Sequence, residues 1–123
     1  MGFYEFPQES LVVVSPPRTV TAEWRFVVAG GRVVAGSLYK RGGKLEMELA
    51  ADAAALALAE EIAGHGYEPD RVWVLDVGRT AEGEYALLEI GGFSFSDLYA
   101  TDKDAVVATV SAAAMRVWDA ARK

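Results

Sequence analysis

Cysteine is absent from this chain of 123 residues, and basic residues are outnumbered by acidic ones. Without cysteine, disulfide bonds and thiolate metal sites are excluded. Twelve Lys and Arg stand against 18 Asp and Glu, which gives a formal net charge of -6. Nucleic-acid binding requires a basic field, so nucleic acid is not an expected partner. One or two local Arg side chains are still able to bind a small anion.

Long apolar segments are also missing. No apolar run approaches the roughly 18 residues of a membrane-spanning helix, so no membrane partner is expected. Residues 1–10 hold neither the basic nor the apolar stretch of a secretory signal. We therefore expect a cytoplasmic protein. The length fits a single domain over residues 1–123, and a chain of this size can bury a sizeable core.

Short β-branched runs bounded by Gly and Pro predict a sheet built from hairpins. The predicted strands are residues 11–15, the two runs that flank Gly30-Gly31, residues 45–49, residues 71–77 and residues 84–90. Helices are predicted over residues 50–66, with Asp52 as the cap, and from Thr101 to about residue 122. This order indicates an α+β fold, an antiparallel β-sheet of hairpins covered by two helices on one face.

Two carboxylates are predicted to meet in the second hairpin. If Glu82-Gly83 forms its tip, Asp76 lies opposite Glu89 on the same face, with Cβ atoms roughly 5 Å apart. Like charges at that separation need a shared proton, a Lys or Arg, or a metal ion. Hard oxygen ligands on a hairpin suit Mg²⁺. The alternative is that both acids simply point into solvent.

The first hairpin offers a cation for this face. With Gly30-Gly31 at the tip, Arg25 lies opposite Gly36, which leaves room for the guanidinium to cross the sheet. Glu23 shares a face with Arg25. An Arg beside a Glu on a strand is most often a surface ion pair of little energetic weight. It can also be a bidentate clamp for a phosphate or a carboxylate.

Three motifs follow one another along the chain: EWRFVVAGGRVVAG (residues 23–36), VLDV (74–77) and LLEIGGFSFSDLY (87–99). Together they resemble the C-terminal half of the ATP-grasp superfamily. The resemblance is strongest to the short clade named for one Arg and two Lys, and more distant to RimK-like ligases. It extends from about Val12 to Ala113. It implies an ATP-grasp C-terminal subdomain, and an activity that activates a carboxylate with ATP and passes the acyl group to an amine.

The resemblance also implies cofactors, Mg²⁺ and ATP, and roles for individual residues. Arg25 would be the catalytic residue, beside the nucleotide phosphates or the acyl-phosphate. Asp76 would be the first Mg²⁺ ligand, and Glu89 would bridge metal ions between phosphates. Glu23 and Lys40 are the further candidates for contact with the cofactor. For Lys40 the alternative is a solvated residue at the exit of the hairpin.

Two departures from the family pattern bear on activity. The family's Glu-x-Asn is Glu89-Ile90-Gly91 here, so the third metal ligand has no side chain. The family also has an N-terminal half, which supplies its Lys residues and much of the nucleotide pocket, and this sequence starts at the C-terminal subdomain. One hypothesis is a truncated ligase-like domain with residual Mg-ATP binding, inactive until an N-terminal half completes it. The other is a non-catalytic binding or homo-oligomerisation module, such as a homodimer, that keeps the subfold.

Overall fold

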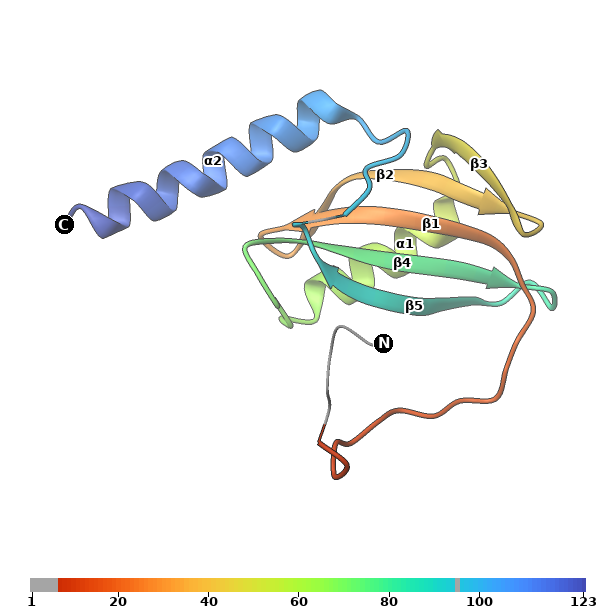
Figure 1. Ribbon diagram of the computed structural model, residues 1–123. Coiled ribbons are helices and arrows are strands. Elements are labelled where there is room, and N and C mark those ends of the chain that lie inside the picture. Colours follow the sequence, from red (N-terminus) through yellow and green to blue (C-terminus); the bar gives the residue numbers. More distant parts are fainter. Residues whose placement is uncertain (1–6, 95) are drawn as a thin grey trace.

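The computed structural model describes residues 7–94 and 96–123. Its elements are β1 (Val20–Ala29), β2 (Arg32–Arg41), β3 (Lys44–Leu49), α1 (Ala53–Gly64), β4 (Val72–Thr80), β5 (Tyr85–Gly92) and α2 (Lys103–Ala121). The strands form one antiparallel sheet of order β3-β2-β1-β4-β5 (Figure 1). The α+β class, the hairpins and the two helices are therefore confirmed. In the described part of the chain, no helix has the length and apolarity needed to cross a membrane.

The two helices pack on opposite faces of the sheet, so the prediction that both lie on one face is wrong (Figure 1). Helix α1 covers the larger core, which includes Trp24, Phe26 and Trp73. Helix α2 contacts the other face through Val106 and Ala113. Because alternate strand residues point to opposite faces, the buried run of β4 supplies apolar side chains to both. We call the α2 side of the sheet the open face, because α2 covers only part of it before projecting away (Figure 1).

Residues 11–15 are not a strand, although their β-branched run predicted one. Leu11 and Val13 are 100% and 99% exposed. Ser15 lines a pocket together with Leu87 and Leu88 of β5, so the end of the segment approaches the sheet without pairing with it. Backbone bonding to the sheet begins at Thr19, whose carbonyl accepts a hydrogen bond from the Ala81 N–H at 3.0 Å. A strand requires a neighbour that completes its backbone hydrogen bonds. The β-branched run shows that residues 11–15 favour a strand conformation, but it does not show whether a neighbouring strand is present.

The first hairpin turns at Gly30-Gly31 as predicted, and both glycines have positive φ. A one-residue shift in register follows, so Arg25 lies opposite Ser37, and the predicted pairing with Gly36 is wrong. Gly36 instead lies opposite Phe26. A Cβ on Gly36 would be 2.4 Å from Cδ1 of Phe26. The missing side chain therefore makes room for an aromatic ring of the α1 core, not for the guanidinium.

The second hairpin pairs Asp76 with Glu89, as predicted, but it reaches this register by another route. Its turn is residues 81–83, closed by a 2.8 Å hydrogen bond from the Thr80 N–H to the Glu84 carbonyl. The predicted tip had one residue fewer. A one-residue shift just after Asp76 restores the register. The cross-strand placement of the two acids is thus confirmed.

Asp52 is the N-cap of α1, as the sequence predicted. Its carboxylate accepts hydrogen bonds from the N–H groups of Ala54 (3.1 Å) and Ala55 (2.9 Å), and Tyr85 donates its hydroxyl to the other oxygen at 2.9 Å. Burial alone would raise the pKa of Asp52, but these hydrogen bonds outweigh it and the net shift of the pKa is downward. The cap thus ties the start of α1 to β5.

Replacing Asp52 by Ala is expected to lower the free energy of unfolding at pH 7 by about 1 kcal/mol. A carboxyl group with a lowered pKa stabilises the fold above its unfolded-state pKa, and that stability is lost as the pH falls through the folded-state pKa. The difference between wild type and D52A should therefore shrink below about pH 4. Urea unfolding at a series of pH values measures it. D52N, which keeps the cap without the charge, should lack the pH dependence.

Candidate functional site

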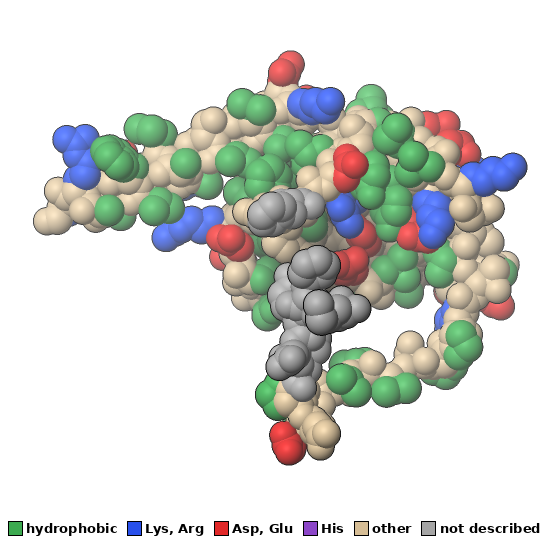
Figure 2. Space-filling model, in the orientation of Figure 1, with side chains coloured by type: hydrophobic (Ala, Val, Ile, Leu, Met, Phe, Trp, Pro, Cys, Tyr) green, Lys and Arg blue, Asp and Glu red, His purple; other side chains and the backbone are tan. Residues whose placement is uncertain are grey.

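A group of charged and aromatic side chains lies at the centre of the open face. It consists of Glu23 and Arg25 from β1, Tyr39 and Lys40 from β2, and Asp76 from β4. Figure 2 views this face and shows acidic and basic side chains close together there. Four of the five predicted site residues belong to this group, and we call it the Arg25 cluster. It contains two cations and two carboxylates, so its charges balance internally.

Arg25 and Asp76 form the core of the Arg25 cluster. They are direct cross-strand partners, and the guanidinium donates to both carboxylate oxygens, Nε to Oδ1 and Nη2 to Oδ2, at 2.8 Å each. The side chains are only 15% and 4% exposed. The hydrogen bond to Asp76 raises the pKa of Arg25 further above its ordinary value. Arg25 thus forms a bidentate ion pair with a carboxylate of the protein itself, and its predicted role as a clamp for a bound phosphate stays a prediction.

Tyr39 connects the Arg25–Asp76 ion pair to a second ion pair, between Lys40 and Glu23. Its hydroxyl lies 2.6 Å from Oε2 of Glu23 and 3.3 Å from Oδ2 of Asp76. Burial and the hydrogen bond to Glu23 raise the pKa of Tyr39, so the hydroxyl remains a donor. Lys40 pairs with Oε1 of Glu23 at 3.0 Å. Lys40 is the next-to-last residue of β2, at the end of the first hairpin as the sequence predicted, and its contact with a cofactor stays a prediction.

Tyr99 completes the surroundings of Arg25. Its ring stacks on that of Tyr39, with centres 4.7 Å apart, and the guanidinium carbon of Arg25 lies 5.5 Å and 5.7 Å from the centres of the Tyr99 and Tyr39 rings. Tyr99 has a φ of 51°, the single positive value outside glycine in the described chain. Positive φ is rare for a bulky residue and marks a constrained position.

Ser37 anchors the loop that carries Tyr99. It is fully buried, and its hydroxyl oxygen accepts the Ala100 N–H at 3.1 Å and lies 3.0 Å from the Glu48 carbonyl oxygen. Sequence reasoning missed Tyr39, Tyr99 and Ser37. The β1–β2 register skips Tyr39, and such an irregularity re-aims side chains, but it is visible only in the structure.

The metal-ligand roles of Asp76 and Glu89 remain predictions, and their surroundings differ. Asp76 is buried and neutralised by Arg25, whereas Glu89 is exposed. Two carboxylates on paired positions suit Mg²⁺ shared with phosphates. However, within residues 7–94 and 96–123 no group of three or more His, Asp or Glu side chains could hold a metal ion. The donor types thus fit a cation that phosphates complete, but one donor is already engaged by Arg25.

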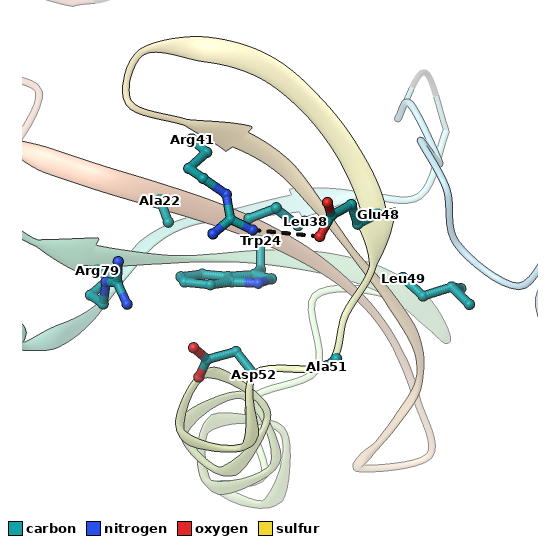
Figure 3. A pocket seen from close by; sticks show the side chains of 9 residues that line it. All are labelled: Ala22, Trp24, Leu38, Arg41, Glu48, Leu49, Ala51, Asp52 and Arg79. Carbon is teal, nitrogen blue, oxygen red and sulfur yellow. Dashed lines mark hydrogen bonds and ion pairs between the residues drawn. The ribbon is translucent and has the colours of Figure 1, made fainter.

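A separate small cavity lies on the α1 side of the sheet. Figure 3 shows the Trp24 ring between the start of α1 and strands β1 and β2, with Arg41 and Glu48 at one side and Arg79 at the other. Arg41 pairs with Glu48 at 3.5 Å and with Glu46 at 3.0 Å. The cavity of about 200 Å³ is smaller than the roughly 300–1,000 Å³ of ordinary ligand pockets. None of the predicted site residues lines it.

Comparison with known proteins places the chain in a family. Searches of curated proteins and of solved structures each found no match. A family model does match, an ATP-grasp domain described as family 3 of the clade named for one Arg and two Lys, and it covers residues 3–110. That range includes all three motifs and every residue of the Arg25 cluster. The chain therefore belongs to the ATP-grasp superfamily, in family 3 of that clade.

Proposed function

We propose that this domain contributes one half of an ATP-binding site, with the Arg25 cluster facing the nucleotide phosphates. The observation that carries the proposal is the set of charged side chains from three adjacent strands on the open face of the sheet. ATP-grasp proteins generally bind ATP and Mg²⁺. An N-terminal ATP-grasp half, in the same or another polypeptide, would cover this face and complete the pocket.

The residues divide by charge in this proposal. Arg25 donates two N–H groups to Asp76 in the protein alone, and in the complex its guanidinium would turn to a phosphate oxygen. Lys40 is 43% exposed and reaches phosphate by leaving Glu23. Asp76 and Glu89 would hold Mg²⁺ together with the phosphates, and the cation would neutralise charge that develops during phosphoryl transfer. The reaction would be ATP-dependent carboxylate–amine ligation, as the resemblance implies.

Isothermal titration with Mg-ATP tests the proposal. We expect millimolar or tighter binding to the domain, strengthened when an N-terminal ATP-grasp half is added. Lys40→Met should weaken binding on the order of 10-fold, because one charge-assisted hydrogen bond to phosphate is lost. Lys44→Met, which removes a lysine at the start of β3 outside the cluster, is the matched control. Absence of binding, or equal affinity of K40M and K44M, would contradict the proposal.

A non-catalytic assembly module is the second candidate, and exposed apolar side chains favour it. On α2, Val107 and Trp118 are 63% and 60% exposed, and on β3 Leu45 is 69% exposed. Soluble monomers rarely leave large contiguous apolar surfaces uncovered. In this candidate the titration shows no nucleotide binding, and light scattering over a concentration series shows a homodimer.

A further inference from the structure

We propose that Arg25 acts as a built-in counter-cation on Asp76, so that a divalent cation binds there only after the guanidinium has been displaced. The inference rests on the proposed function in one respect, that Asp76 and Glu89 form a cation position. The new element is that Arg25 blocks this cation position as long as the protein has no ligand. In this proposal Arg25, and not the missing side chain at Gly91, limits metal binding by the protein alone.

The first support is the occupancy of the Asp76 oxygens. Oδ1 accepts from Nε of Arg25, and Oδ2 accepts from Nη2 and lies 3.3 Å from the Tyr39 hydroxyl. An ionised carboxylate has only about four lone-pair positions, and Mg²⁺ requires an oxygen at roughly 2.0–2.1 Å. A divalent cation at that distance would also lie next to the positive guanidinium. Three of these positions are taken, and a divalent cation at the remaining one is opposed by the charge of the guanidinium.

The second support is that Arg25 is held in place from several sides. Its side chain is 15% exposed, and the stacked rings of Tyr39 and Tyr99 lie against it. The loop that carries Tyr99 is fixed by the bond from Ala100 to Ser37 and by a 2.9 Å bond from the Tyr99 N–H to the Asp97 carboxylate. Displacing the guanidinium costs these contacts as well as the fork, so free metal is a weak competitor. A phosphate, as a second anion for Arg25, would lower that cost.

The missing side chain at Gly91 is a competing explanation for a closed cation position, and two substitutions distinguish it from the effect of Arg25. A Cβ built at Gly91 meets only ordinary contacts, with Cγ2 of Val74 at 3.4 Å and Oε1 of Glu89 at 3.8 Å. The Cβ of an Asn is therefore tolerated at this position, on the same face of β5 as Glu89. Gly91→Asn restores the family's third ligand without touching Arg25, whereas Arg25→Met releases Asp76 without adding a ligand.

The test measures binding of Mn²⁺ alone, by electron paramagnetic resonance of the free ion, to wild type, G91N, R25M and the R25M/G91N double variant. We expect R25M to bind Mn²⁺ on the order of 10-fold more tightly than wild type, which corresponds to about 1.4 kcal/mol. G91N alone should resemble wild type, and the double variant should bind most tightly. Binding by wild type or by G91N as tight as that of R25M would overturn the proposal.

Thermal unfolding gives an independent readout, because R25M loses a buried partner. A ligand that binds only the folded state raises the melting temperature with its concentration. At one Mn²⁺ concentration, the melting temperature of R25M should rise more than that of wild type or of R25M/D76N. If R25M stays unfolded with Mn²⁺ present, or binds Mn²⁺ equally well after D76N is added, the cation does not replace the guanidinium. Because the probe contains no nucleotide, a failure to bind ATP would remove the proposed function and leave this result standing.

Discussion

Replacing Asp76 by Asn is expected to lower the free energy of unfolding by about 3–5 kcal/mol. Asn carries no negative charge and cannot accept both hydrogen bonds from the guanidinium of Arg25. The guanidinium, at 15% exposure, therefore keeps its charge without a counter-charge. Removing one partner of a buried ion pair is costly because the remaining charge stays desolvated. The loss would be large beside the total stability of a small domain, about 5–15 kcal/mol. Chemical denaturation with a two-state fit measures it.

The matched control removes both charges together. Buried ion pairs replaced by apolar residues of similar size are often neutral or stabilising, whereas single removals are not. Arg25→Met combined with Asp76→Leu should therefore be far more stable than either single substitution, and the double-mutant cycle should give a strongly favourable coupling energy. If D76N is as stable as wild type, or if the two single effects simply add, the fork does not carry this part of the stability.

The cross-strand pair of acids, considered without Arg25, would give this stability effect the opposite sign. From the sequence, Asp76 faces Glu89, and repulsion between the acids suggests that neutralising Asp76 stabilises the protein. That cross-strand pairing is correct. The stronger neighbour lies on the other side of β4, where Arg25 is the direct partner of Asp76. The register of a hairpin can be predicted from its turn residues. The pairing of β1 with β4 joins segments about 50 residues apart, so no turn residue determines its register.

The fold shows the same limit. Turn glycines, the Asp52 cap and the periodicity of the helices were sufficient to predict all five strands and both helices of the structure. The sequence did not predict that α1 and α2 lie on opposite faces. Strand β4 is buried along nearly its whole length, so no solvent-facing row of polar residues marks an outer face. Four members of the Arg25 cluster were singled out because they are charged residues at strand positions, and their functional roles stay predictions. Tyr39 and Tyr99 were missed because an aromatic residue in a strand or loop looks the same in a core and in a site.

Gly36→Ala is expected to destabilise the protein by about 1–3 kcal/mol, through overpacking of the α1 core. The added Cβ would lie 2.4 Å from Cδ1 and 2.7 Å from Cε1 of Phe26, and 3.1 Å from the Cβ of Ala50. Phe26 is 1% exposed, so its ring cannot move aside into solvent. Because β2 also carries Ser37 and Tyr39, a shift of its backbone would be transmitted to the Arg25 cluster. Thermal and urea unfolding measure the loss.

Gly91→Ala is the matched control, because it adds the same methyl group to a strand glycine without a clash. The nearest atom to a Cβ at Gly91 is Cγ2 of Val74, at 3.4 Å, which is ordinary van der Waals contact. Alanine also reduces the conformational entropy of the unfolded chain, so G91A should be neutral or stabilising by up to about 1 kcal/mol. Phe26→Leu added to G36A should recover part of the loss, since the smaller side chain relieves the contact that the methyl group creates. Equal effects of G36A and G91A would mean that the close approach of Phe26 to Gly36 does not limit this core.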